Sequence, residues 1–332
     1  LAIRAAGFTP GEADQLRRAM AAWKRKGHLL KRFGGRIIRG MLANGYDRAF
    51  AERCFEQIKG FGEYGFPESH AASFALIVYV SAWLKHHHPA AFAASLINSQ
   101  PMGFYAPAQI VRDAKEHGIE VRPVDVNHSA WDCTLEQGDG AGRLALRLGM
   151  RLVRGLQEQV ADRIAQAVVQ HGRFDDVESL RRASAAPVVA LRRLASADAF
   201  ASMGLDRQHA LWVIRRLRDQ PLPLFDQVIT PAEPDARLPR ITLPHRVLHD
   251  YTSTGLSLKA HPLSFLRPRL DQLGVTRNVR LLDSAACPDR MPIIVAGLVL
   301  IRQRPSTASG IVFMTIEDET GIANLIFRPR IF

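Results

Sequence analysis

Residues 153–164 read Val153-Arg154-Gly155-Leu156-Gln157-Glu158-Gln159-Val160-Ala161-Asp162-Arg163-Ile164 and carry the most informative fold pattern in the chain. Apolar residues lie on both sides of the glycine, and the apolar positions that follow recur at helical spacing. A hairpin of this kind between two helices can present backbone N–H groups to a phosphate, and it then binds duplex DNA without reading its sequence. An ordinary turn between two helices fits the same residues. The stretch therefore predicts a helical domain with a candidate phosphate contact.

Positive charge is concentrated around this stretch and at the start of the chain. The 332 residues have a formal net charge of +12 at pH 7. Residues 143–218 contain fourteen arginines and no lysine against seven carboxylates, and residues 1–40 contain ten basic residues against two carboxylates. Arginine binds phosphate oxygens as a bidentate fork, whereas lysine is a point charge. The distribution favours a nucleic-acid partner, with a solvated basic surface as the alternative.

Cysteine spacing and hydropathy exclude several classes of protein. The isolated cysteines Cys54, Cys133 and Cys287 exclude paired zinc-ligand spacing and argue against a disulfide framework, so we expect a reducing, cytoplasmic compartment. The longest apolar stretch, 71–84, is shorter than the roughly 20 residues that span a bilayer, which predicts a buried helix and no membrane partner. Because the sequence starts at Leu1 and stops within an apolar run, we expect a fragment of a longer polypeptide.

Periodicity and punctuation predict a multidomain, mainly α protein in five parts. Helical spacing covers residues 1–118, and short alternating runs in 119–146 indicate a small β or connecting segment. Helices return in 147–218. Repeated proline with little periodicity indicates a linker with connecting helices over 219–291. β-Branched runs in 292–332 predict three strands in meander order.

These three runs fit the first part of an OB-like β-barrel that is truncated at its C-terminus, and an antiparallel sheet of another kind of domain is the alternative. Barrels of this type bind single strands through a basic groove and stacked aromatic rings. Burial statistics favour a core position over a stacking role for Phe313 and Phe327. The expected DNA-binding cations of the barrel are Arg302, Arg304 and Arg328.

A second informative stretch is Lys59-Gly60-Phe61-Gly62-Glu63-Tyr64-Gly65-Phe66-Pro67-Glu68-Ser69-His70-Ala71-Ala72-Ser73-Phe74. Its Phe-Pro-Glu-Ser sequence indicates a helix start with proline in the first turn. Small residues, Ser69 and His70 at a helix N-terminus can form an anion site. An ordinary capped core helix is the alternative.

The stretch closely resembles the fingers signature of bacterial polymerase III alpha subunits, which is Tyr-Gly-Phe, two variable residues, then His-Ala-Ala. Residues 11–20 and 83–85 also resemble the fingers of that family. Residues 19–27, 67–69 and 98–104 are most similar to its error-prone, damage-inducible branch. The resemblance covers essentially the whole chain.

Residues 191–210 resemble the second half of the tandem helix-hairpin-helix unit of the same polymerases, with Gly204 between Met203 and Leu205. Together with residues 153–164, they predict a tandem helix-hairpin-helix DNA-binding domain over 147–218. The expected DNA-binding residues of this domain are Arg154, Gly155, Gln157, Arg163, Gly204 and Arg207.

The resemblance implies an error-prone DNA-directed DNA polymerase that acts in damage-induced mutagenesis and translesion synthesis. In that family two Mg²⁺ ions are held by palm aspartates. We expect the palm to lie before Leu1, so no residue here is assigned as catalytic or metal-binding, and the chain alone should be inactive. The implied partners are primer–template DNA, deoxynucleoside triphosphates, the sliding clamp and accessory proteins of the mutagenesis complex. The alternative is a non-enzymatic DNA-binding module of helix-hairpin-helix and OB type.

Two shorter motifs indicate a function less specifically than the stretches above. Gln220–Phe225 resembles peptides that dock into the bacterial sliding clamp, but an extra proline disturbs the usual spacing. The adjacent residues of His86–His88 do not share a helix face, which favours a helix-end cation over a metal site.

The basic segment of the fingers is predicted to serve the incoming nucleotide. Arg17 and Lys24, seven residues apart, could share one face of a helix. A solvated face or a face against the DNA backbone is the alternative. The expected nucleotide-binding residues are Arg17, Arg18, Lys24, Arg25, Lys26 and His70.

In the full-length enzyme, Arg17→Ala and Lys24→Ala should each lower apparent nucleotide affinity by roughly tenfold or more, because a charge-assisted contact contributes about 1.5–3 kcal/mol. Steady-state primer extension gives the nucleotide KM, and a binding titration gives the DNA affinity, which should stay nearly intact. Weaker DNA binding with an unchanged nucleotide KM would assign these residues to the duplex instead.

Overall fold

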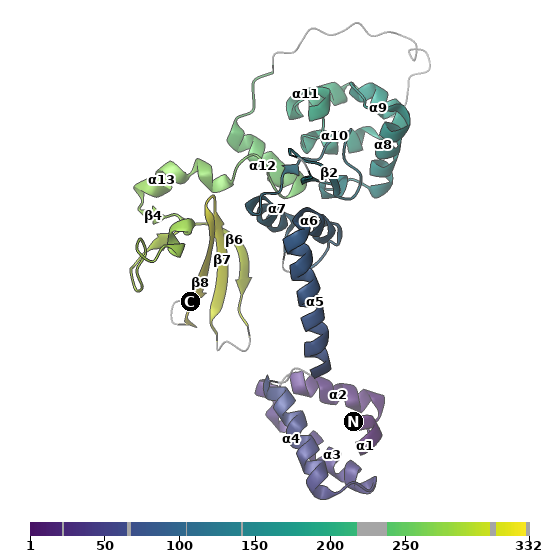
Figure 1. The fold of residues 1–332 in the computed structure, drawn as a ribbon, viewed down its shortest axis with the longest axis vertical. Helices are drawn as coiled ribbons and strands as arrows, with labels where there is room; N and C mark the ends of the chain where they lie inside the picture. The colour runs from purple at the N-terminus through teal and green to yellow at the C-terminus, as the bar shows by residue number, and fades with distance from the viewer. Residues whose placement is uncertain are drawn as a thin grey trace. The chain divides into compact units, whose positions relative to one another are not determined.

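The structure is a computed structural model that divides into two compact units, Leu1–Trp83 and Leu84–Phe332, whose elements are labelled in Figure 1. The mainly helical, multidomain fold predicted from the sequence is confirmed. Within residues 17–32 and 59–70 the structure describes the backbone but not the side chains, apart from the residues left out below. The described residues are 1–21, 23–64, 68–103, 105–140, 142–217, 238–305 and 310–329.

The first unit contains α1 (Ala2–Ala6), α2 (Pro10–Ala21), α3 (Trp23–Ala43), α4 (Arg48–Tyr64) and most of α5 (Glu68–His87). Its core is formed by apolar side chains that include Phe8, Ile37 and Met41. The start of α2 follows from local sequence, because Thr9 and Glu12 form a reciprocal capping box. Arg36 then pairs with Glu12 at 2.7 Å and lies over the ring of Phe8, which joins α3 to this cap.

Helix α5 is apolar on every side rather than along one stripe. Leu76, Ile77 and Tyr79 are exposed in the described chain, and 70% of Tyr79 is accessible. The buried helix predicted over 71–84 is therefore helical but exposed. An all-round apolar helix is normally covered in a folded protein.

The second unit begins with α6 (Pro89–Asn98) and α7 (Pro107–Glu116), followed by a small sheet. In that sheet β3 (Leu144–Arg147) lies between β1 (Val121–Arg122), which is parallel to it, and β2 (Thr134–Gln137), which is antiparallel. The β segment predicted over 119–146 is confirmed. The helices α8 (Glu158–His171), α9 (Val177–Ser184), α10 (Val188–Ser196) and α11 (Arg207–Arg215) then form the helical body with this sheet.

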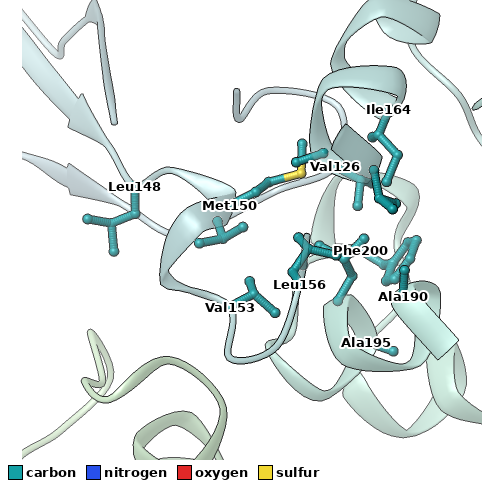
Figure 2. Close-up of a cluster of buried hydrophobic side chains, with 14 of the residues drawn as sticks. Val126, Leu148, Met150, Val153, Leu156, Ile164, Ala190, Ala195 and Phe200 are labelled. Atoms are coloured by element: carbon teal, nitrogen blue, oxygen red, sulfur yellow. The ribbon is translucent and has the colours of Figure 1, made fainter. Parts of the chain in front are cut away.

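One hydrophobic core runs through α6, α7, the sheet and α8–α11. Figure 2 shows its centre, where Met150, Ile164 and Phe200 are fully or almost fully buried. Ile97 of α6 and Ile110 of α7 belong to the same core. The boundaries expected at residues 118 and 146 therefore fall inside one packed body, because separate stretches of sequence share its apolar interior.

The part expected to be a linker contains two differently packed pieces. Helix α12 (Leu243–Thr254) packs on α10, and Leu256 joins the core of the helical body. Beyond it lie η3 (Pro262–Phe265), α13 (Arg267–Gln272), β4 (Val275–Thr276), η4 (Asn278–Leu282) and β5 (Ile294–Val295). The buried guanidinium of Arg267 bonds to Asp318 at 3.0 Å, which attaches α13 to the C-terminal sheet.

The C-terminal sheet is an antiparallel meander of β6 (Leu298–Gln303), β7 (Val312–Asp318) and β8 (Gly321–Phe327), in that order (Figure 1). The three predicted strands are confirmed. Within the described residues the strands do not close into a barrel, so the OB-like barrel remains a prediction.

Gly40→Ala should destabilise the first unit by about 1–3 kcal/mol, as expected for overpacking. A Cβ at Gly40 would overlap the backbone carbonyl of Ala6, where α1 crosses α3. The control is Gly35→Ala on the same helix, whose Cβ would approach only the Arg39 guanidinium at 3.7 Å. That control should gain up to about 1 kcal/mol from helix propensity. Urea unfolding followed by circular dichroism measures both changes, and equal effects would contradict this close approach.

Candidate nucleic-acid interface

The first hairpin, residues 153–157, connects η1 (Met150–Leu152) to α8. Its apolar residues Val153 and Leu156 are buried in the core (Figure 2), whereas Arg154, Gly155 and Gln157 are exposed. Gly155 has a φ of 75°, in the left-handed region that glycine adopts without strain. Burial of the flanking apolar side chains thus presents the glycine turn at the surface, as the sequence pattern predicts.

Helix α8 begins without a side-chain cap, because its N-cap residue Gln157 makes no capping bond. Within the described residues, the N–H groups of Gly155 and Gln157 meet no hydrogen-bond acceptor. Unsatisfied N–H groups and the positive end of the helix dipole together favour an anion at such a helix start. The first hairpin therefore has the donors that a phosphate contact needs.

Arg193 is a cation at the first hairpin that sequence reasoning missed. It extends from α10 and donates through Nη1 to the carbonyl oxygen of Gly155. A Cβ on Gly155 would lie 3.1 Å from the Arg193 Cζ, so this glycine also makes room for the guanidinium. Because the two residues are far apart in sequence, only the packing of α10 on the hairpin brings them together.

The two predicted arginines of this region have different surroundings. Arg154 is exposed, and its backbone N–H donates to the carbonyl oxygen of Ser253 at 2.9 Å. Arg163 donates from Nε to Ser184 at 3.0 Å and from Nη2 to Ala185 at 3.3 Å. These acceptors are carbonyl groups at the C-terminus of α9, where a cation stabilises a helix end. Arg163 therefore has a structural role at this helix end.

The second hairpin, residues 203–206, connects η2 (Ala201–Met203) to α11. Gly204 is exposed and has a φ of 71°, close to that of Gly155. Its N–H donates to Ala201 at 3.0 Å, and the carboxylate of Asp206 caps α11 by accepting from the His209 N–H at 2.9 Å. The two glycine turns are alike in backbone conformation. At the second hairpin, however, the N–H groups of Gly204 and His209 are already bonded to acceptors within the protein.

Arg207 requires a correction. It was predicted to bind DNA, but only 4% of the residue is accessible. Its Nε donates to the carbonyl of Ser196 at 2.8 Å, its Nη1 to that of Arg246 at 3.1 Å, and its Nη2 to the carboxylate of Asp250. All three guanidinium nitrogens are therefore bonded inside the protein, and Arg207 joins α12 to the second hairpin.

Asp250 is the anionic centre of this contact. Its carboxylate also accepts from Lys259 Nζ at 2.8 Å and from the hydroxyl of Ser257 at 2.7 Å. Burial opposes ionisation, but hydrogen bonds from Lys259, Ser257 and Arg207 together hold the pKa of Asp250 below its ordinary value. Lys259 reaches Asp198 as well, at 3.1 Å. Arg246 approaches Asp198 at 3.6 Å, so the cluster contains three cations and two carboxylates.

A mostly buried polar segment, residues 124–129, connects the chain after α8 to the residues before the second hairpin and was not singled out from the sequence. Asp125 accepts from the N–H and the hydroxyl of Ser202, at 3.0 and 2.7 Å. Asn127 pairs with the backbone of Phe174 through both amide atoms, each at 2.9 Å. Its only sequence signal is an alternation of valine with polar residues, which is also typical of an exposed strand.

The C-terminal sheet presents the predicted arginines Arg302, Arg304 and Arg328 at its surface, where all three are exposed. Phe313 is 39% accessible, so the favoured core position is wrong for this ring. It lies on β7 opposite Gln303 on β6 and Ile326 on β8. Phe327 is half-buried. The ring of Phe313 is thus accessible for the stacking that single-stranded DNA requires.

The predicted nucleotide-binding residues can be placed only by their backbones. Arg17 and Arg18 lie in α2, Lys24, Arg25 and Lys26 in α3, and His70 in α5, while their side chains are outside the description. The shared face proposed for Arg17 and Lys24 requires one continuous helix through residue 22, which is not a described residue. Their role therefore stays a prediction.

Three further expectations concern metals, membranes and the clamp. In the described ranges there is no group of three or more His, Cys, Asp or Glu side chains that could hold a metal ion. Among the helices in the described part of the chain, none is long and apolar enough to cross a bilayer. The clamp-like peptide Gln220–Phe225 falls outside the described residues.

Comparison with known proteins adds the family context. Residues 118–210 match the helix-hairpin-helix motif family. The whole chain is 51% identical over 341 residues to Error-prone DNA polymerase 2 of Rhizobium meliloti (strain 1021), covering 31% of that protein. It is also 51% identical over 342 residues to an error-prone DNA polymerase of Brucella abortus, covering 30% of it, and 49% identical over 355 residues to one of Mesorhizobium japonicum. The chain thus spans less than a third of the length of these curated relatives.

Arg207→Ala should lower the free energy of unfolding by about 1.5–3 kcal/mol, because it removes one of the two cations bonded to the buried Asp250 carboxylate and leaves Lys259 as the other. The matched control is Arg192→Ala, an exposed arginine on α10, which should change stability by no more than about 0.5 kcal/mol. Urea unfolding measures both. If Arg207→Ala instead weakened DNA binding at unchanged stability, the originally expected DNA contact would be correct.

Proposed function

We propose that the chain belongs along its whole length to the error-prone DNA polymerase family and forms part of a DNA-directed DNA polymerase for damage-induced mutagenesis and translesion synthesis. The observation that carries the proposal is 51% identity over the entire chain to a protein of that name. The chain corresponds to 31% of that relative, so the activity is proposed for a longer polypeptide.

Within that polymerase, this chain binds primer–template DNA and holds it in position. The support is the uncapped N-terminus of α8, the exposed Gly155 turn and the cations Arg154 and Arg193 beside it. Phosphate contacts of this kind fix the position of the duplex without reading its sequence. The exposed arginines of the C-terminal sheet are proposed to bind the single-stranded part of the template.

The metal chemistry is proposed to lie elsewhere in the polymerase. Bound Mg²⁺ would neutralise phosphate charge and align the attacking oxygen. The described residues of this chain do not form a site for it. What this chain can contribute is positioning, including contact with deoxynucleoside triphosphates through the basic segment of α2 and α3. The polymerase is further proposed to act in the cytoplasm, and to bind the sliding clamp and the accessory proteins of the mutagenesis complex.

A second candidate is a DNA-binding module without enzymatic activity. The match of residues 118–210 to the helix-hairpin-helix motif favours it, because this motif accounts for DNA binding without catalysis. The two candidates differ in what the longer polypeptide contains. A nucleotidyltransferase centre with paired aspartates distinguishes the polymerase from the module.

The chain alone should bind primer–template DNA but should not extend the primer, because positioning groups cannot replace metal ligands. Its affinity should fall steeply with salt, since each arginine–phosphate contact releases counterions. Fluorescence anisotropy at several salt concentrations measures binding, and a gel assay with Mg²⁺ measures extension. The full-length polypeptide is the positive control. Magnesium-dependent extension by the chain alone would contradict the proposal that the metal site lies elsewhere in the polymerase. Absence of DNA binding would contradict the proposal that this chain binds primer–template DNA.

A further inference from the structure

The two hairpins of the helical body share a backbone conformation but differ in what their glycine N–H groups bind. Gly155 and Gly204 have φ values of 75° and 71°. Within the described residues, the N–H of Gly155 meets no acceptor, whereas the N–H of Gly204 is bonded to Ala201 at 3.0 Å. An N–H that already has a protein acceptor must lose it before it can bind a phosphate.

The helix that follows each hairpin differs in the same direction. The N-cap of α8, Gln157, makes no side-chain capping bond. At α11 the N-cap is Asp206, which accepts from the N–H of His209 at 2.9 Å and from its ring Nδ1 at 2.8 Å. The carboxylate of Asp206 is bonded at the end of the helix dipole where an external anion would bind, and it repels that anion. Helix α8 also has an acid in its first turn, Glu158, but that residue is exposed and is not the N-cap of the helix.

The basic residue next to the second hairpin is also unavailable. Arg207 is the first residue of α11, yet its three guanidinium nitrogens bond to Ser196, Arg246 and Asp250. Two of these three acceptors, Arg246 and Asp250, lie in segment 243–259, which comprises α12 and the turn after it. Only 4% of Arg207 is accessible, so a phosphate cannot reach this guanidinium while these bonds hold it inside the protein.

The same segment neutralises the charge around the second hairpin. Asp250 of α12 and Asp198 next to α10 face Arg207 and Lys259. Arg246 approaches Asp198 at 3.6 Å. Two carboxylates thus face three cations within one contact. Most of the positive charge is compensated there, and the long-range attraction that brings phosphate to a basic surface is weakened.

We propose that the helical body binds DNA through the first hairpin alone, and that the second hairpin is a protein-docking hairpin occupied by the chain's own segment 243–259. This inference rests on the proposed DNA-binding function and specifies which half of the tandem unit performs it. The docked segment also reaches the first hairpin, because the N–H of Arg154 donates to the carbonyl of Ser253 at 2.9 Å. Docking at the second hairpin thus orients the first.

The chain offers a matched pair of substitutions for the test. Gln159 and Gln208 are each the second residue of the helix that follows a hairpin, α8 and α11 respectively. Gln159→Glu and Gln208→Glu add one negative charge at equivalent positions and keep the shape of the side chain. A carboxylate in the first turn of a helix is compatible with the helix dipole, so both variants should fold.

The measurement is the affinity of each variant for a short DNA duplex at low salt, by fluorescence anisotropy. Gln159→Glu should weaken binding by roughly fivefold or more, as expected for like charges a few ångströms apart at a water-exposed site. Gln208→Glu should stay within about twofold of the parent, because DNA is distant from it and salt screens what remains.

Amide hydrogen exchange gives an independent readout on the unaltered chain. Added duplex should slow exchange of the Gly155 N–H and leave that of Gly204 unchanged. An equal loss of affinity in both variants, a loss in Gln208→Glu alone, or protection of Gly204 by DNA would overturn the inference. So would parental affinity in both variants, which would place DNA elsewhere on the chain while preserving the proposed function. Failure of the parent chain to bind any duplex would instead overturn the proposed function, and the inference with it.

Discussion

The arrangement of the helical body depends on the burial of residues 124–129 between the small sheet and the helices around the hairpins. Val124 and Val126 enter the core, while Asp125 and Asn127 remain almost fully buried. An unpaired buried polar group costs about 1–3 kcal/mol, so their partners are fixed. Those partners are Ser202 beside the second hairpin and Phe174 after α8. One short segment therefore sets the relative position of elements distant in sequence.

Buried polar groups need partners within the protein, and for this reason fewer arginines are available to DNA than the basic composition indicates. Among the fourteen arginines of residues 143–218, several serve the fold. Arg147, which is 7% accessible, pairs with Glu136 at 2.7 Å. Hydrogen bonding from Arg147, and from Arg122 as well, outweighs desolvation and lowers the pKa of Glu136 to about 2. Arg207 is likewise enclosed. The arginine fork that suits phosphate equally suits a carboxylate of the protein itself.

Domain boundaries were harder to predict than elements. Local periodicity and glycine and proline punctuation identify the helical regions, the strands of the C-terminal meander and the hairpin at Gly155, and the structure contains all of these. The β4–β5 pair was not predicted. The stretch 219–291 was predicted as one linking part, but α12 packs on the helical body and Arg267 bonds to the C-terminal sheet. A boundary depends on which core an apolar side chain enters, and that information is absent from local spacing.

The helical class, the strand meander and the first hairpin could be derived from the sequence, because apolar periodicity and glycine turns are local properties of the chain. The roles of individual cations could not. Arg154 and Arg207 both stand beside a hairpin glycine and were predicted alike, yet the first is exposed and the second is buried. Their difference arises from Asp250, a carboxylate 43 residues beyond Arg207 that the packing of α12 delivers to its guanidinium. Burial and ion pairing are set by distance in space, and distance along the chain does not report it.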